Sequence, residues 1–267
     1  MAEFQNRFAQ PGTTARQTGA VVDQGLRSYM LSVYNYMAAG IALTGIVAYL
    51  VFTQSVTTDV ALAAKSAAGG AFALKRGMYL TQLGVTLFAS PVKWVIMLAP
   101  LAFVMLLSFR VYKMSVAATQ VSFWAFAAVM GLSLSSIFLV FTQQSISQVF
   151  FVTAAAFGAL SIYGYTTKKD LSGWGTFLFM GLIGIVIAAI VNLFLQSSAL
   201  QFAISCLGVL IFAGLTAYDT QQIKDGYYQI AGDATLMAKG AIMGALNLYL
   251  DFINMFQSLL SLFGNRE

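Results

Sequence analysis

Seven apolar runs, most of them about twenty residues long, follow one another along the chain and are separated by polar segments. An α-helix needs about 20 apolar residues to cross a bilayer, and these runs lack the two-residue alternation of membrane β-strands. The pattern therefore predicts an all-α integral membrane protein, a bundle of seven transmembrane helices. The expected spans are residues 29–52, 92–109, 116–141, 148–165, 174–195, 199–224 and 236–263.

The first 28 residues are polar and contain no apolar run, so they predict neither a signal peptide nor a packed domain. We expect residues 1–28 to form a flexible cytoplasmic tail and residues 29–267 to form a single membrane domain. The long connection after the first span ends in an apolar stretch, residues 78–90, which we expect to lie along the membrane surface.

The seventh run keeps its small and polar residues on one helical face. They are Gly240, Gly244, Asn247, Asp251, Asn254, Ser258 and Ser261, at alternating intervals of four and three. That spacing places side chains above one another on a helix. Hydrocarbon offers amides and carboxyls no partners, so this face is expected to turn towards other helices or a water-filled path.

Two aspartates stand out because they interrupt, or end, an apolar run. Asp219 ends the apolar part of the sixth run, and Asp251 lies near the middle of the seventh. A carboxylate at the centre of a membrane helix costs about 2.5–3.5 kcal/mol on insertion scales. Both are therefore candidate functional residues, with Asn247, Asn254, Ser258 and Gln222 as polar neighbours on the two runs.

Glycines on the faces of the fifth and seventh runs are expected to be packing sites, because small residues let helix backbones approach closely. In the span 174–195 these are Gly181 and Gly184, and Asn192 lies on the same face. Whether Asn192 serves packing or function is left open. In the last run the packing glycines are Gly240 and Gly244.

Whether the two aspartates meet depends on where the turn between the last two helices lies. If the sixth helix ended at Lys224, the carboxyls would be about ten residues, or roughly 15 Å, out of register. If it continued to about Ile230, with a turn at 231–232 and Asp233 as N-cap, the offset would shrink to about one turn. Two carboxyls in contact at a dry site cannot both ionise at low cost, so they would share one proton.

Composition narrows the class further. Only 9% of the residues are charged and the mean hydropathy is +0.80, whereas soluble domains carry about 25% charged residues. One cysteine and no histidine exclude a disulfide framework and argue against a structural zinc site. The net charge of +5 is spread thinly over loops, so neither nucleic-acid binding nor a cofactor is expected.

Charges in the short loops predict the orientation. With the N-terminus in the cytoplasm, the inner loops carry five basic residues: Arg110, Lys113, Lys168, Lys169 and Lys224. The outer loops at 142–147 and 196–200 carry none. Because basic residues favour the cytoplasmic side, we expect a multi-pass protein of the bacterial inner membrane with a cytoplasmic N-terminus.

Several segments resemble the Bax inhibitor family, the transmembrane Bax-inhibitor-motif proteins, and most closely its bacterial branch. They are GYTTKKDLSGWGTFLFMGLIGIVIAAIVNLFLQS, AYDTQQIK, LNLYLDFINMF and GLSLSSIF. The resemblance covers about residues 29–263. It implies a seven-helix bundle whose seventh helix is central. It also implies a di-aspartyl pair, here Asp219 and Asp251, that senses pH for a calcium leak across the membrane.

Two other functions fit the same residues. The protein could be a regulatory or scaffold protein that binds another complex, such as a membrane protease, with the aspartates purely structural. An intramembrane aspartyl protease also uses two aspartates, and Tyr218–Asp219 matches its first motif. However, Asp251 lacks the preceding Gly-x-Gly turn that admits water and substrate, so no enzyme activity is expected.

Overall fold

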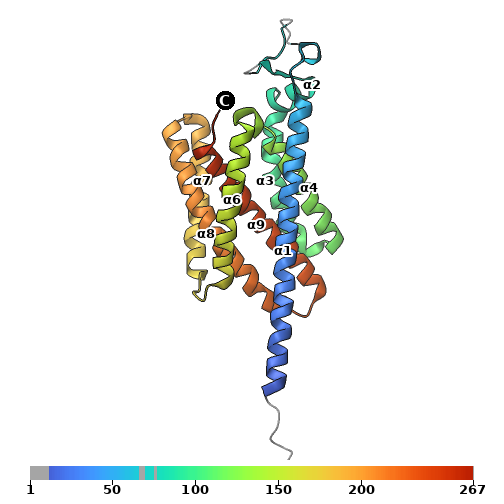
Figure 1. Ribbon diagram of the computed structural model, residues 1–267, viewed down its shortest axis with the longest axis vertical. Helices are drawn as coiled ribbons and strands as arrows, with labels where there is room; N and C mark the ends of the chain where they lie inside the picture. The colour runs from blue at the N-terminus through green and yellow to red at the C-terminus, as the bar shows by residue number, and fades with distance from the viewer. Residues whose placement is uncertain (1–11, 66–69, 75–76, 267) are drawn as a thin grey trace, which may run out of the picture.

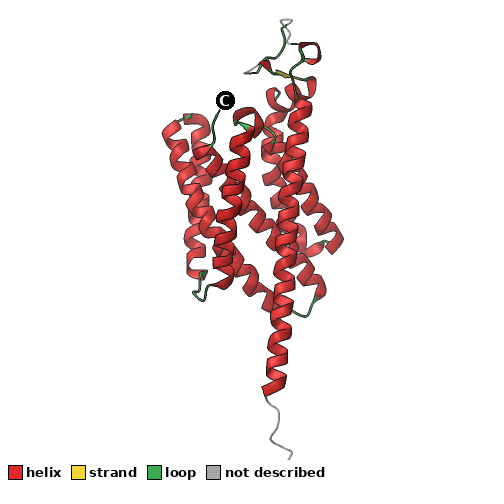
Figure 2. Cartoon of the chain, viewed as in Figure 1, coloured by secondary structure: helices red, strands yellow, loops and turns green. Residues whose placement is uncertain are grey.

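The structure is a computed structural model that describes residues 12–65, 70–74 and 77–266, with the side chains of 12–23 and 112 left out of the description. The described chain contains seven helices long and apolar enough to cross a membrane, as the sequence predicted. These spans are Gln24–Ser55, Val92–Arg110, Val116–Val140, Gln143–Thr166, Ser172–Leu195, Ser198–Ile230 and Ala234–Phe263. The protein is therefore an all-α membrane bundle (Figures 1 and 2).

The spanning helices carry the labels of Figure 1. They are α1 (Gly12–Ser55), α3 (Val92–Arg110), α4 (Val116–Leu134), α6 (Gln143–Thr166), α7 (Ser172–Leu195), α8 (Ser198–Ile230) and α9 (Ala234–Phe263). The third span is completed by the short α5 (Ile137–Val140) after a break at Ser135 and Ser136.

The first helix begins earlier than the sequence predicted. Residues 12–28, assigned to a flexible tail, are helical, while residues 1–11 lie outside the described chain. The helix continues because its apolar stripe does: Leu26, Tyr29 and Met30 are all buried. The ring of Tyr29 packs against that of Tyr227 on α8, with centroids 5.4 Å apart. Polar residues interrupt this apolar stripe so often that the sequence does not show it as a membrane-spanning run.

The turn between α8 and α9 is the later of the two alternatives. Helix α8 runs to Ile230, so the predicted end at Lys224 is wrong and the continuation is confirmed. Gly232 has a φ of +110°, a backbone conformation that favours glycine. The carboxylate of Asp233 then accepts from the backbone N–H groups of Thr235 and Leu236, at 2.8 and 3.0 Å, and caps α9.

Helix α9 is the most buried of the seven. Within its most apolar window 56% of the residues are buried, against 6% in α7. It packs against α1, α4, α6 and α8 and crosses the bundle obliquely in Figure 1. Helix α7 packs mainly on α8, so most of its surface is left for lipid.

The bundle has two ends. The C-terminal end carries the C-terminus and the connection between α1 and α3, at the top of Figure 1. That connection holds β1 (Val56–Thr57) paired with β2 (Tyr79–Leu80), the 3₁₀ turn η1 (Val60–Leu62), α2 (Gln82–Gly84) and the π-helical turn η3 (Val85–Ala89). The stretch 78–90 is therefore partly helical. The N-terminal end carries the 3₁₀ turn η4 (Val111–Lys113), the loop between α6 and α7, and the turn between α8 and α9.

Three of the four glycines predicted to mediate packing do so. A Cβ on Gly181 would lie 2.6 Å from Ile211, one on Gly240 would lie 2.8 Å from Ile230, and one on Gly244 would lie 3.2 Å from three carbons of Ile223. Gly184 is different, since a Cβ there would meet nothing within 4 Å. Gly184 therefore mediates no close helix contact, although it lies on nearly the same face of α7 as Gly181.

Candidate functional site

The two predicted aspartates meet between α8 and α9. The carboxyl groups of Asp219 and Asp251 lie next to each other, close enough to interact directly. Asp251 is 5% exposed, and Asp219 is half-buried. The long α8 and the tight turn before Asp233 bring the pair into register. The site therefore consists of two carboxyls from adjacent antiparallel helices, enclosed in an apolar bundle.

The chemistry of this contact requires a proton. An ionised carboxylate only accepts hydrogen bonds, so two carboxyls bond to each other only if one of them is protonated. The Oδ2 atom of Asp251 is buried and has no partner within the described chain. No cation or hydrogen-bond donor thus offsets a second charge at this oxygen. Within residues 12–65, 70–74 and 77–266, no three His, Cys, Asp or Glu side chains gather to hold a metal.

Helix α9 is also fixed through Tyr249, two residues before Asp251. The Tyr249 hydroxyl lies 2.7 Å from Oγ1 of Thr44, which in turn lies 2.8 Å from the carbonyl oxygen of Ala127. The Thr44 hydroxyl donates its proton to the carbonyl oxygen of Ala127, so the Tyr249 hydroxyl is the donor to Thr44. The ring stacks edge-on against Phe126 at 5.4 Å. One contact therefore links α9 to both α1 and α4, and sequence analysis missed it because Thr44 looks like an ordinary helix residue.

Among the described residues, the other predicted polar side chains form no hydrogen bond with the pair. Asn254 donates to the carbonyl of Leu250 at 2.9 Å, and Ser258 donates to the carbonyl of Asn254 at 2.8 Å. Asn247 is exposed rather than turned into the bundle, although Gly244 on the same face packs against Ile223 of α8. The structure thus brings together two of the predicted residues and places these three elsewhere.

Asn192 and Gln222 have local roles. The Asn192 carbonyl accepts from the backbone N–H of Ser197 at 3.0 Å, and its amide donates to Gln201 at 3.1 Å. Asn192 therefore stabilises the turn between α7 and α8. Gln222 donates to Ser172 at 3.3 Å.

The residues that follow Asp219 hold the loop between α6 and α7 against α8. Gln221 donates to the carbonyl of Lys169 and accepts from the N–H of Leu171, both at 2.8 Å. Lys224 donates to the carbonyl of Tyr165 at 3.0 Å. In the same loop, hydrogen bonds from Ser172 hold the pKa of the exposed Asp170 carboxyl below its usual 3.8. Any displacement of α8 at the pair must also move this loop.

A cavity of about 930 Å³ lies between α3, α4, α7, α8 and α9 towards the C-terminal end. Its polar lining includes Ser133, Ser136, Gln201, Ser205, Asn254, Gln257, Ser258, Ser261 and Arg266. Its other walls are apolar and include Phe212 and Leu250. Leu250 directly precedes Asp251, and the aspartates are not among the lining residues. The carboxyl pair therefore lies just beyond the wall of a partly polar cavity.

These features define a seven-helix integral membrane protein with a buried pair of carboxyls between its last two helices. The family profile described as inhibitor of apoptosis-promoting Bax1 matches residues 26–267. The chain belongs to this family, the Bax inhibitor-1 family.

Its relatives include bacterial membrane proteins. The chain is 45% identical over 244 residues to the inner membrane protein YbhL of Escherichia coli K12, covering 91% of this chain and 94% of YbhL. It is 43% identical over 268 residues to an uncharacterized protein of Caulobacter vibrioides, with both chains fully covered. An uncharacterized protein of Rickettsia prowazekii is 42% identical over 254 residues, covering 95% of this chain and 96% of its own.

Proposed function

We propose that this protein is a pH-sensitive cation leak, with Ca²⁺ as the permeant ion and the Asp219–Asp251 pair as its pH sensor. The observation that carries the proposal is the contact between two carboxyls on different helices, one of them 5% exposed. Ionisable groups inside a membrane bundle are costly and commonly belong to ion or proton pathways. The proposal assigns no catalysis and no cofactor to the pair.

The route for the ion is supported by the cavity of about 930 Å³. Hydroxyl and amide oxygens on its walls can replace part of the hydration shell of a cation. Phe212 and Leu250 form part of its apolar wall, and the carboxyl pair lies behind that wall. With the pair in contact the path is closed, and it opens when α8 and α9 separate.

Protonation controls that separation. With one proton between them, the two carboxyls form a charge-assisted hydrogen bond, which is about twice as strong as a neutral one. A second proton, taken up as the pH falls, replaces this bond by a weaker bond between neutral acids. The link between α8 and α9 is weakened, so calcium flux is expected to rise on acidification.

The test is calcium-dye influx into proteoliposomes that contain the purified protein, measured from about pH 5 to 8, a range in which paired carboxyls commonly titrate. Flux should exceed that of protein-free vesicles and rise towards acid pH. A second set of vesicles, loaded with a potassium-sensitive dye, measures the flux of a monovalent cation for comparison with that of Ca²⁺. Flux equal to that of empty vesicles at every pH would contradict the leak and favour a scaffold that binds a membrane protease or another complex.

We further propose that the protein lies in the inner membrane with its N-terminus in the cytoplasm, from the basic residues of the loops at the N-terminal end. A reporter fused after Lys169 should then read cytoplasmic, and one inserted at Gln144 should read external. The structure supports this pairing, since Lys169 and Gln144 lie at opposite ends of α6. The reverse pattern would place the basic loops outside and overturn the orientation.

A further inference from the structure

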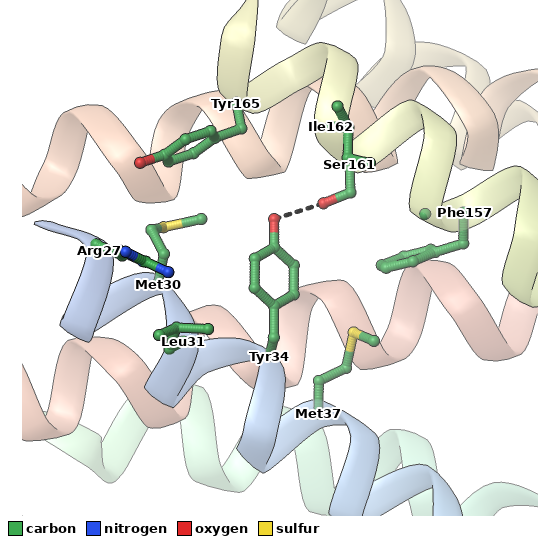
Figure 3. Close-up of a pocket in the computed structure, with 10 residues that line it drawn as sticks. Arg27, Met30, Leu31, Tyr34, Met37, Phe157, Ser161, Ile162 and Tyr165 are labelled. Carbon is green, nitrogen blue, oxygen red and sulfur yellow. Dashed lines mark hydrogen bonds between the residues drawn. The ribbon is translucent and has the colours of Figure 1, made fainter.

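A second cavity, of about 530 Å³, lies between α1 and α6 towards the N-terminal end of the bundle. Figure 3 shows its walls, with Tyr34 reaching from α1 towards Ser161 on α6. Its lining is apolar apart from these two hydroxyls, Tyr165 and one cation, and includes Met30, Leu31, Met37, Phe157 and Ile162. Its volume lies within the range of about 300–1,000 Å³ that is common for ligand pockets.

The cavity exists because α1 and α6 are not closely packed in the described chain. The Tyr34 hydroxyl bridges the gap and lies 2.6 Å from Oγ of Ser161, which lies 3.0 Å from Oγ1 of Thr220 on α8. Thr220 donates to the carbonyl of Thr216 at 2.7 Å. The bridging hydroxyls thus satisfy one another, and the gap needs neither an ion nor water to complete their hydrogen bonds.

Gly158 on α6 widens the gap. A Cβ at this position would meet nothing within 4 Å, and the residue lines the cavity. An apolar void in a membrane protein leaves its lining without dispersion contacts on one side. Lipid tails are as apolar as leucine, so a gap between two membrane helices is a place for an acyl chain.

The one cation among the described residues that line this cavity, Arg27, lies at its outer end. Arg27 lies on α1 three residues after the candidate span begins, and Tyr165 lies one residue before α6 ends. Both line the cavity towards the N-terminal end of the bundle, close to the ends of the two spanning helices. The amine of Lys224 lies 5.9 Å from the centre of the Tyr165 ring. An arginine offers a phosphate two parallel N–H donors, and basic pockets between membrane helices bind anionic headgroups.

We propose that this cavity binds an anionic phospholipid, with one acyl chain between α1 and α6 and its phosphate against Arg27. Tyr34 and Ser161 then form the floor against which the chain packs. Because the floor is hydrogen-bonded to Thr220, the residue after Asp219, the bound lipid stabilises the contact of α1 and α6 with α8. The binding itself does not depend on the proposed ion leak.

The experiment is native mass spectrometry of the full chain in mild detergent, titrated with dioleoyl phosphatidylglycerol or dioleoyl phosphatidylcholine. We expect tighter retention of phosphatidylglycerol. Arg27→Gln should reduce its affinity about fivefold, since one basic residue near the headgroup contributes about 1 kcal/mol, and should reduce that of phosphatidylcholine less, because the choline ammonium already offsets the charge of its phosphate. Lys113→Gln removes an exposed charge at the same end and should change neither.

Filling the cavity tests the acyl-chain part of the site. Gly158→Leu should lower the retention of both lipids, and Gly158→Ala should lie between it and the parent. Gly184→Leu is the matched control, because that glycine also faces open space but does not line this cavity. Gly158→Ala keeps the test valid if the leucine variant fails to fold. Each of three results would overturn the proposal. The Gly158 variants could retain lipid as the parent does, or Arg27→Gln could keep the parent's lipid preference. Free oleate could also displace the bound lipid where added phosphatidylglycerol does not.

Discussion

Replacing Asp219 or Asp251 by Asn is expected to abolish the pH dependence of calcium flux in proteoliposomes between about pH 5 and 8. Each carboxyl is a partner of the other, so removing either leaves nothing to share the proton. An asparagine can still donate to and accept from the remaining aspartate. The Asn variants should therefore keep a weaker, pH-insensitive link and a moderate resting flux.

Alanine at either position is expected to give a higher flux at neutral pH than asparagine does. It removes a hydrogen bond to a charged group, a loss of about 1.5–3 kcal/mol, which raises the open population about tenfold or more. The double variant should add little to either single one, because the two residues act as a unit.

The matched control is Asp225→Asn, which removes an exposed carboxyl six residues further along α8. It should keep the pH profile of the parent. A parent-like profile in both Asn variants at the pair would remove the di-aspartyl sensor and leave the scaffold function in its place.

Gly164→Ala is expected to lower the thermal midpoint of the purified protein by about 5–10 °C. A Cβ at Gly164 would overlap the carbonyl oxygen of Ala217 and lie 2.9 Å from its carbonyl carbon. These are backbone atoms of α8, so α6 and α8 must move apart. Overpacking of this kind costs about 1–3 kcal/mol, and each kcal/mol shifts the midpoint by about 2–4 °C in a chain of this size class.

Gly158→Ala on the same helix is the control for this prediction. Its Cβ meets nothing, and alanine in a helix is favoured over glycine by about 1 kcal/mol. Its midpoint in the same detergent should equal or exceed that of the parent. Equal midpoints for the two alanine variants would show that α6 and α8 are not in backbone contact at Gly164.

The spans were predictable because a membrane imposes a length and a composition on each helix. The capping role of Asp233 was also predictable, since a carboxylate ahead of a helix leaves a local signal. The extension of α1 was not, because its buried residues are interleaved with polar ones and are covered by distant partners such as Tyr227. The expectation that the seventh helix is central stays a prediction, although α9 is the most buried helix of the bundle.

The site was predictable in part for a related reason. Asp219 and Asp251 are conspicuous because charge in an apolar run is costly. Asn247 was wrongly expected to face inward, because helical spacing defines a face but does not show which positions on that face the neighbouring helices cover. The cavity beside Gly158 was missed because it is a gap between α1 and α6, two helices that are far apart in the sequence. A glycine that creates a gap and a glycine that closes one, such as Gly164, look the same in sequence.

The order of the helices has a consequence for biogenesis. Helix α9 is made after the other six spanning helices, has the lowest mean hydropathy of the seven, and carries the buried Asp251. Its carboxyl offsets part of the free energy that drives insertion, whereas the short turn at Gly232 delivers it beside α8 and Asp219. Six helices are thus made before the one against which four of them pack. A nascent chain that stops before Ala234 lacks the surface on which α1, α4, α6 and α8 assemble.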